Sequence, residues 1–234
     1  MTNKHILYCT FTPQYYKMPL HEYNITEPHG RLGIWHITED EAFFVQKLPL
    51  VEREKMEIEE VTGRKRLERL AGKLLMRQLT GWAYSIEKDK YGKPFFKDSE
   101  LHLSLSHSGD YVAGIISERP VGIDIQYLTS KLERVAPRVM NENKLKNLDP
   151  NNRLEHLHVY WGAKEALYKA YGQKGLDFKK HIIIKPFHIM HTDHASHATK
   201  ITEGSVLTDN SKHLFDIFYK KIKNYILVYA IEKR

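Results

Sequence analysis

The order of apolar and polar residues along the chain predicts a mixture of strands and helices. Residues 30–37 read Gly-Arg-Leu-Gly-Ile-Trp-His-Ile, a composition typical of a strand. From Leu50 to Leu79 the pattern is helical: a charged stretch at 52–60 comes first, and apolar residues then recur at helical spacing from Leu67 to Leu79. Gly81 is expected to end this helix, because glycine readily takes the left-handed conformation that closes helices.

Two further strands and a turn are predicted in the middle of the chain. Between Leu101 and Ser117, leucines first alternate with histidine and serine, as in a strand with one buried face. The triplet Ser108-Gly109-Asp110 supplies the turn between the two strands. Pro120 then interrupts the chain, and Val121–Ile125 begins another strand.

The C-terminal half combines helices with strands. A polar helical stretch is expected at about 131–149, and a longer helix at Arg153–Tyr171 that Gly172 and Gly175 end. The remainder, about 176–234, has the short apolar runs of strands.

These elements indicate an α+β fold, because strands and helices do not alternate strictly as they do in parallel βαβ units. The interruption near 118–120 divides the chain into an N-terminal lobe, 1–118, and a C-terminal lobe, 119–234.

Composition narrows the class of protein. The chain has 234 residues, enough for one large domain or two small lobes, with ordinary hydrophobic (41%) and charged (28%) contents. Its one cysteine, Cys9, excludes an internal disulfide framework, and the apolar run Ile6–Phe11 is too short for a signal peptide or a membrane span. We therefore expect a cytoplasmic protein that does not associate with membranes.

The net charge of +7 favours an anionic partner, which nucleic acids, phosphorylated small molecules and acidic proteins could all provide. A basic surface that only keeps the protein soluble explains the charge equally well. Because no RNA- or DNA-binding signature is legible, we do not expect nucleic acid as the partner.

The first candidate for chemistry is the strand Val121-Gly122-Ile123-Asp124-Ile125-Gln126. Side chains alternate along a strand, so Asp124 and Gln126 project from one face, opposite to the two isoleucines. Two oxygen-bearing side chains on one face suit a hard cation such as Mg²⁺. An aspartate that caps the strand end or pairs with a lysine is the alternative, and this segment alone favours that alternative.

The second candidate is the helix that contains Glu165 and Lys169. These residues are four apart and lie on one face, where an ordinary surface ion pair is the more common outcome. Together with Asp124, however, Glu165 would complete a carboxylate metal site, and Lys169 would meet a phosphate oxygen.

The third candidate is the strand end Ser104-Leu-Ser106-His107-Ser108-Gly109, where hydroxyls, an imidazole and backbone N–H groups gather. Such a corner suits phosphate, and a polar hairpin turn is an equally good interpretation. A hydrolase is disfavoured, since Ser106 and His107 point to opposite faces of a strand and no nucleophile elbow accompanies them. The histidines at 188, 191, 194 and 197 are disfavoured as a zinc site, because they lie in a polar loop without cysteine.

Four segments in order carry a resemblance to a known family: Tyr91-Gly-Lys-Pro, Ser104-Leu-Ser-His-Ser-Gly, Val121-Gly-Ile-Asp, and Trp161-Gly-Ala-Lys-Glu-Ala with Lys169 after it. With them the chain resembles the 4′-phosphopantetheinyl transferase superfamily, specifically its long, single-chain Sfp-type members. The similarity covers about 91–176, with a weaker helix match at 64–79. Each segment alone is a weak signal, whereas four in register are a specific one.

The resemblance implies two similar α+β lobes in one chain, with coenzyme A bound between them. It implies transfer of the 4′-phosphopantetheine arm to a serine of an apo acyl or peptidyl carrier protein, with release of 3′,5′-ADP. The long members usually act as monomers, so a monomer is expected.

The resemblance also implies roles for individual residues. A Mg²⁺ ion is expected at Asp124, Gln126 and Glu165; Glu165 or a water that it orients would accept the serine proton, and Lys169 would stabilise charge on the transferred group. Coenzyme A is expected to contact five residues: Arg69, Lys93, Ser106, His107 and Lys174.

Two positions depart from the family's pattern. Gln126 stands where many relatives carry glutamate, which removes one negative charge from the metal site, and Gly162 stands where serine or threonine is usual. The alternative function is therefore a module that binds coenzyme A or a carrier protein with reduced or lost catalysis.

Overall fold

The computed structural model describes residues 20–26, 30–189 and 198–233, with side chains from residue 30 onward. Cys9, the run Ile6–Phe11 and the histidines at 191, 194 and 197 lie outside the described residues. None of the helices in the described part is long and apolar enough to cross a membrane.

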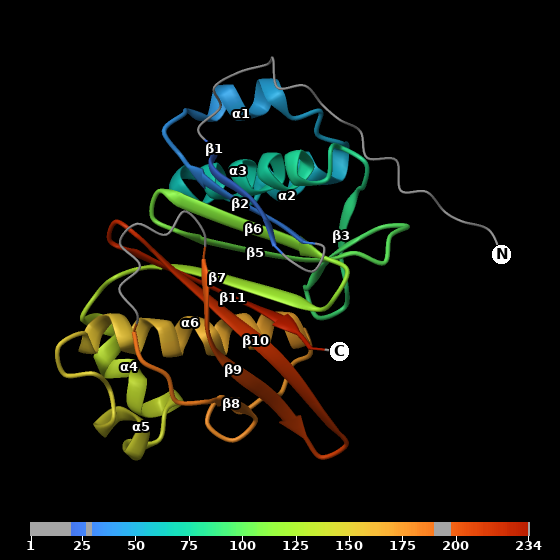
Figure 1. Ribbon diagram of the computed structural model, residues 1–234. Coiled ribbons are helices and arrows are strands. Elements are labelled where there is room, and N and C mark those ends of the chain that lie inside the picture. The colour runs from blue at the N-terminus through green and yellow to red at the C-terminus, as the bar shows by residue number, and fades with distance from the viewer. Residues whose placement is uncertain (1–19, 27–29, 190–197, 234) are drawn as a thin grey trace.

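The first half of the chain forms a four-stranded antiparallel sheet in the order β1-β2-β6-β5. Its strands are β1 (Leu20–Thr26), β2 (Gly30–His36), β5 (His102–Ser108) and β6 (Tyr111–Ser117). Three helices cover one face of this sheet (Figure 1): α1 (Glu41–Lys47), α2 (Glu52–Glu59) and α3 (Gly63–Leu79). The core between them is apolar, and α3 contributes more of its aliphatic side chains than any other element. A small hairpin, β3 (Ile86–Lys88) and β4 (Pro94–Phe96), follows α3.

The second half forms a five-stranded antiparallel sheet in the order β7-β11-β10-β9-β8. Its strands are β7 (Val121–Tyr127), β8 (Ile182–Ile184), β9 (Thr199–Thr208), β10 (Ser211–Ile222) and β11 (Tyr225–Glu232). Its helices are α4 (Lys131–Val139), α5 (Glu142–Lys146) and α6 (Arg153–Tyr171). The long helix α6 packs across the sheet and is largely buried, with the left-handed Gly172 at its end.

The two sheets face each other through the sides that their helices leave uncovered. A third apolar core joins alternate side chains of β2 and β6 to those of β7 and β11, among them Ile34, Ile115, Ile123 and Tyr229. The layers are therefore helices, sheet, sheet and helices (Figure 1). The last strand of the first half ends at Ser117 and the first strand of the second half begins at Val121. Both halves contribute side chains to the central core.

The mixture of helices with two antiparallel sheets confirms the α+β class. The single helix expected from Leu50 to Leu79 is wrong in one respect, because α2 and α3 are separate. Gly63, at the start of α3, has a φ of +57°, a left-handed conformation that a continuous helix does not contain. The stretch at 131–149 likewise forms two short helices, since Met140 between them is extended.

Candidate active site

The seam between β5 and β7 is built from serine side chains. Each of these strands lies at the edge of its sheet, so β7 turns a row of backbone N–H groups towards β5. Three alternate serines of β5 accept these N–H groups: Ser104 from Ile123 at 3.1 Å, Ser106 from Ile125 at 3.2 Å and Ser108 from Tyr127 at 3.1 Å. The repeated serines of the sequence motif therefore join the two halves of the protein.

Asp124 lies at the centre of this seam. Its side chain points away from Ile123 and Ile125, which enter the central core, as the alternation predicted. The residue is only 7% exposed, and its Oδ1 accepts hydrogen bonds from Ser106 Oγ at 3.0 Å and from Lys169 Nζ at 2.8 Å. A buried carboxylate is stable only with such partners.

Lys169 connects helix α6 to this carboxylate. Besides Asp124, its Nζ donates to Ser106 Oγ at 3.0 Å and to the backbone oxygen of Ile123 at 2.9 Å. The structure thus pairs Lys169 with the seam, and no ion pair joins it to Glu165 one turn earlier. The hydroxyl of Ser106 is fully used, because it also donates to Asp124 and accepts the N–H of Ile125.

Glu165 faces the same site from α6. It is half-buried and makes no hydrogen bond or ion pair with any residue that the structure describes. Burial, and then the negative charge of Asp124, raise the pKa of the Glu165 carboxyl, while Lys169 opposes the rise. Two carboxylates near one lysine therefore form the electrostatic centre of the site.

Helix α6 approaches β7 closely because of Gly122. A Cβ atom at this position would lie 1.9 Å from the backbone oxygen of Ala166 and 2.7 Å from the backbone nitrogen of Ala170. Only glycine permits this contact, which brings Glu165 and Lys169 on the helix against Asp124 on the strand.

The side chain of Gln126 lies on the same face as Asp124 but is engaged by α6. Its Nε2 donates to the backbone oxygen of His158 at 3.0 Å and to Asp124 Oδ2 at 3.3 Å, and its Oε1 lies 2.9 Å from His158 Nδ1. His158 is 1% exposed, and burial lowers the pKa of its imidazole, which favours the neutral ring. Sequence reasoning missed His158, although it lies seven residues before Glu165 and thus on the same side of the helix.

His107 points away from Ser106, as expected for neighbours on a strand. Its Nδ1 lies 3.0 Å from Oε2 of Glu68, a residue of α3 that is 8% exposed, whereas the imidazole itself reaches the surface. Glu68 was also missed; the available signal was a charged residue on the apolar stripe of α3, four positions before Gly72 and seven before Leu75.

The other residues expected at coenzyme A occupy separate places. Lys93 donates to the backbone oxygen of Ala170 at 2.7 Å and packs against Gly172 at the end of α6. Arg69 lines a cavity beside α3. Lys174 is exposed after α6, and no described residue pairs with it. The structure brings Ser106, Asp124, Gln126, Glu165 and Lys169 together and leaves Arg69, Lys93, His107 and Lys174 around them.

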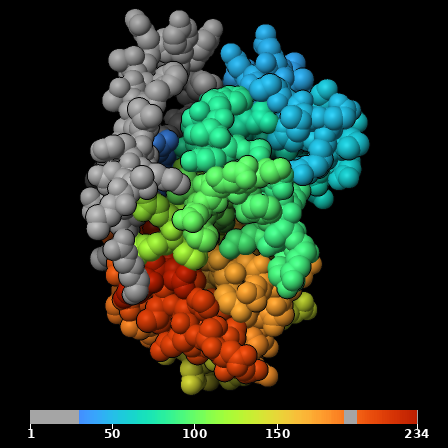
Figure 2. Space-filling view, turned by 90° about the vertical axis from the view of Figure 1, so that its right-hand side faces the viewer, coloured from blue at the N-terminus to red at the C-terminus, as the bar shows by residue number. Residues whose placement is uncertain are grey.

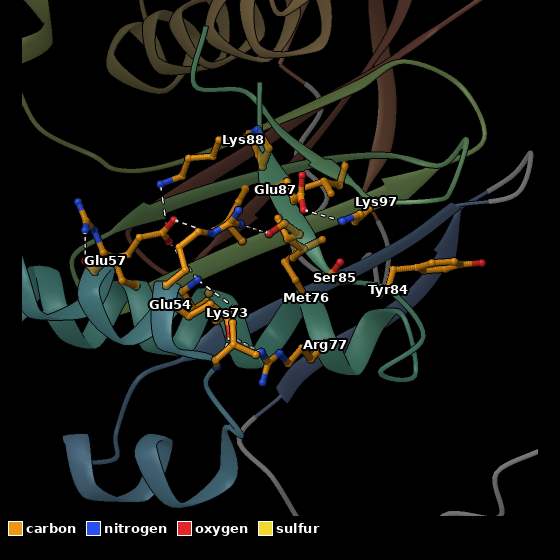
Figure 3. Close-up of a pocket in the computed structure, with 18 of the residues that line it drawn as sticks. Glu54, Glu57, Lys73, Met76, Arg77, Tyr84, Ser85, Glu87, Lys88 and Lys97 are labelled. Atoms are coloured by element: carbon orange, nitrogen blue, oxygen red, sulfur yellow. Dashed lines mark hydrogen bonds and ion pairs between the residues drawn. The ribbon is translucent and has the colours of Figure 1, made fainter. Parts of the chain in front are cut away.

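The cavity has a volume of about 710 Å³ and lies between α2, α3 and the β3–β4 hairpin (Figure 3). Its wall includes apolar side chains of Met76, Ile86, Leu103 and Leu105. Cationic side chains on its lining outnumber acidic ones by six to three: Arg53, Arg69, Lys73, Arg77, Lys88 and Lys97 against Glu54, Glu57 and Glu87.

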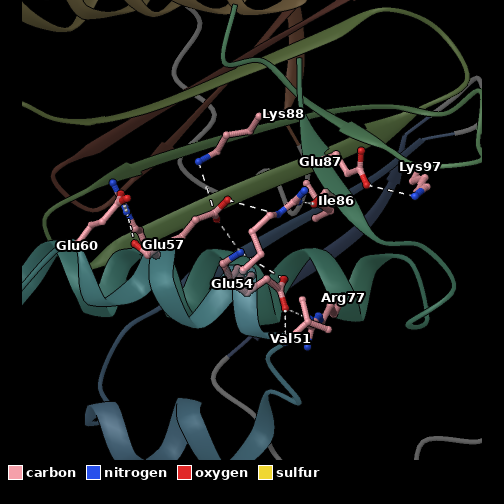
Figure 4. A network of polar contacts seen from close by, with 12 residues as sticks. Val51, Glu54, Glu57, Glu60, Arg77, Ile86, Glu87, Lys88 and Lys97 are labelled. Atoms are coloured by element: carbon pink, nitrogen blue, oxygen red, sulfur yellow. Dashed lines mark hydrogen bonds and ion pairs between the residues drawn. The ribbon is translucent and has the colours of Figure 1, made fainter. Parts of the chain in front are cut away.

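Ion pairs order the charged wall of the cavity (Figure 4). Lys73 bridges Glu54 at 3.3 Å and Glu57 at 3.2 Å, and Arg77 lies 2.6 Å from Glu54. Burial alone would raise the pKa of the Glu54 carboxyl, but Lys73, the N–H of Val51 and Arg77 together hold it below its usual value. The cavity therefore has an apolar interior and an ion-paired rim with surplus positive charge.

No three histidine, cysteine, aspartate or glutamate side chains gather into a metal cluster within the described ranges. A divalent ion at this site would therefore have two carboxylates, Asp124 and Glu165, as its acidic ligands. Burial first and the charge of Asp124 second raise the pKa of Glu165, and a divalent cation favours the charged form of both carboxylates, so the donor set fits Mg²⁺.

Comparison with known proteins shows a similarity that covers this site. Residues 120–230 match the model of the 4′-phosphopantetheinyl transferase superfamily. The chain is 32% identical over 114 residues to the 4′-phosphopantetheinyl transferase gsp of Aneurinibacillus migulanus, which is 44% of this chain and 48% of that protein. It is 29% identical over 118 residues to Sfp of Bacillus subtilis strain 168, 46% of this chain and 52% of the relative. A putative 4′-phosphopantetheinyl transferase of Haemophilus influenzae is 28% identical over 159 residues, 57% of this chain and 65% of the relative.

The chain thus spans about half the length of the first two relatives that it matches. The matched residues include β7, α6 and most of the second sheet, and so Asp124, Glu165 and Lys169. The resemblance noted in the sequence is confirmed: residues 120–230 match the model of the 4′-phosphopantetheinyl transferase superfamily, and the chain is similar to transferases of that name.

Proposed function

We propose that this protein transfers the 4′-phosphopantetheine arm of coenzyme A to a serine of an apo acyl or peptidyl carrier protein. In the reaction, the serine oxygen bonds to the β-phosphorus of coenzyme A, the bond from that phosphorus to 3′,5′-ADP breaks, and the hydroxyl proton passes to a base. The observation that carries the proposal is the buried Asp124, which α6 faces with both a base, Glu165, and a cation, Lys169.

The raised pKa of Glu165 supports its assignment as the base. A carboxylate with a raised pKa takes a proton more readily at neutral pH than an ordinary surface glutamate does. Glu165 would accept the proton directly or through a water that it orients. Lys169 would lie beside the transferred phosphoryl group and offset its negative charge.

The same two carboxylates, Asp124 and Glu165, would hold a Mg²⁺ ion. When bound, Mg²⁺ supplies positive charge that neutralises the pyrophosphate and the leaving 3′,5′-ADP. Asp124, held by Ser106 and Lys169 in a rigid seam, would keep its position through the reaction.

The cavity beside α3 supports binding of the nucleotide end of coenzyme A. An adenine ring suits its apolar wall, and the surplus of cationic side chains suits a 3′-phosphate. Strand β5 links the two places, because Leu103 and Leu105 line the cavity while Ser106 contacts Asp124. Arg69 is the residue expected at coenzyme A that lines this cavity.

The surplus positive charge also suits an acidic carrier protein as the second substrate. With both halves of the fold in one chain, we further propose that the protein acts as a monomer in the cytoplasm.

A mass measurement tests the function. The protein is incubated with apo carrier protein, coenzyme A and Mg²⁺, and the carrier is weighed by mass spectrometry. We expect a gain of one phosphopantetheine arm, and no gain from Asp124→Ala or Glu165→Ala. Asp209→Ala, which removes an exposed carboxylate in the turn between β9 and β10, serves as the matched control and should retain the gain.

The outcomes separate the candidate functions. If a folded protein binds coenzyme A but never modifies any carrier offered, the binding module without catalysis replaces the transferase. If Asp124→Ala and Glu165→Ala both transfer at the wild-type rate, the assigned site is wrong.

A further inference from the structure

The amide of Gln126 has no freedom to turn. The backbone oxygen of His158 can only accept a hydrogen bond, so the atom 3.0 Å from it must be the amide nitrogen. Asp124 Oδ2, 3.3 Å from the same nitrogen, is an acceptor as well. The amide oxygen is thereby directed at His158 Nδ1, 2.9 Å away, and not at the carboxylates.

The backbone at Thr129 fixes the matching state of His158. The N–H of Thr129 donates to His158 Nε2 at 3.0 Å, so this nitrogen carries the lone pair. The proton then sits on Nδ1, which donates to the oxygen of Gln126. The opposite tautomer would point the Nε2 proton at the Thr129 oxygen, 3.1 Å away, and would leave two acceptors, Nδ1 and Oε1, face to face.

Gly162 supplies the room for this arrangement. It lies one turn after His158 on α6, and a Cβ atom there would be 3.0 Å from Gln126 Nε2 and 2.8 Å from Val228 Cγ2. Gln126 and Gly162, the two positions at which the sequence departs from the family's pattern, are therefore in contact. The amide of Gln126 fills the space beside Gly162 that a larger side chain would need.

We infer that Gln126 is a positioning residue for Asp124, locked by His158, and that it does not offer an oxygen ligand to a metal ion. The chain of donors runs from the Thr129 N–H through His158 and Gln126 to Asp124 Oδ2. A divalent cation would then be held by Asp124 and Glu165, with water completing its shell. This inference replaces the expectation that Gln126 is a third ligand, and it depends on the proposed function only for the role of Asp124.

Nuclear magnetic resonance of the metal-free, ¹⁵N-labelled protein tests the lock directly. We expect a two-bond ¹H–¹⁵N correlation pattern for His158 with the proton on Nδ1, and slowly exchanging side-chain N–H signals for Gln126. A proton on Nε2 or a rapidly exchanging Gln126 amide overturns the inference. Neither measurement requires coenzyme A, a carrier protein or catalysis.

Binding of Mn²⁺ alone, measured by calorimetry, tests the positioning role. Loss of an outer partner of a metal ligand typically weakens metal binding by roughly 10–100-fold. We expect Gln126→Leu and His158→Phe each to raise the Kd for Mn²⁺ by about 10-fold or more, and the double variant to be no weaker than either single variant, because both break the same chain.

His156→Phe is the matched control, since it makes the same substitution two residues before His158 on α6. His156 is 3% exposed, accepts the N–H of Asp149 at 2.9 Å and stacks on Tyr160, away from the carboxylates. This variant should bind Mn²⁺ as wild type does.

Three results would contradict the inference. Weaker binding in Gln126→Leu with unchanged binding in His158→Phe would make Gln126 a direct ligand. Unchanged binding in both would remove the positioning role, and a wild-type protein that does not bind Mn²⁺ at all would remove the two-carboxylate assignment. If these tests give the expected results but the protein modifies no carrier, the positioning role of Gln126 stands and the proposed function is rejected.

Discussion

Replacing Gly122 by alanine tests whether the close contact of β7 with α6 builds the site. The added Cβ would lie 1.9 Å from the backbone oxygen of Ala166, and real contacts of this kind do not fall below 3.0 Å, so strand and helix must separate by roughly 1.1 Å. Backbone atoms cannot rotate away as a side-chain end can. Overpacking of a core costs about 1–3 kcal/mol, and this contact lies at the upper end of that range because neither element yields locally.

The expected result is a loss of about 3 kcal/mol in the free energy of unfolding, measured by urea denaturation. For a chain of this length, that loss corresponds to a fall in Tm of roughly 6–12 °C. Transfer activity should fall more steeply than stability, because the shift moves Glu165 and Lys169 away from Asp124 and catalytic geometry tolerates little displacement.

Gly114→Ala provides the control for this variant. Its Cβ would also meet an atom at 2.7 Å, but that atom is the sulfur of Met76, the flexible part of a side chain. We expect a clearly smaller loss and near-normal activity. If Gly122→Ala unfolds within about 1 kcal/mol of wild type, the reasoning about the strand–helix contact is refuted.

Three further outcomes are expected. Ser106→Ala should lower the free energy of unfolding in urea by about 1–3 kcal/mol, since the buried N–H of Ile125 loses its acceptor, whereas Ser108→Ala at the exposed end of the seam should cost less; equal losses would contradict the seam. Gly162→Ala should lower Tm, and pairing it with Gln126→Ala should recover part of the loss; strictly additive losses would show that the amide does not fill that space. Lys185 and Lys233 lower the pKa of Glu203 to about 2. Because the pKa of Glu203 is lower in the folded protein than in the unfolded one, its ion pairs stabilise the fold above the unfolded pKa near 4.5. This stabilisation is lost as the pH falls towards 2. Glu203→Gln should weaken the dependence of the free energy of unfolding on pH in this range, and an unchanged dependence would count against the ion pairs of Glu203.

Much of the fold was predictable from local pattern. Period-two alternation located β5 and β7, and helical spacing located α3 and α6, because each pattern reflects burial of one face of one element. The breaks at Gly63 and Met140 escaped that reasoning, since the left-handed backbone of Gly63 and the extended backbone of Met140 leave no mark on the spacing of apolar residues. The fold class followed from the order of elements, while the shared core of the two sheets did not.

For the candidate site, the sequence identified the residues but not their partners. Asp124, Glu165 and Lys169 were singled out together, and the structure brings them together. The expected neighbours Glu165 and Lys169 are not paired, because Lys169 reaches the seam and donates to Asp124. The serines that suggested a phosphate corner accept N–H groups of β7 in the structure, a partner that the sequence did not indicate.

The sequence by itself therefore determined most of the elements, the fold class, the family resemblance and the candidate site residues Asp124, Glu165 and Lys169. These properties depend on residue type and on spacing within one helix or strand, and both can be read from the amino-acid sequence. Only the tertiary structure decided that His158 locks Gln126, that Glu68 holds His107 and that β5 and β7 meet through serines. Each of these contacts joins different elements, and its geometry depends on how sheets and helices pack, which local spacing does not encode.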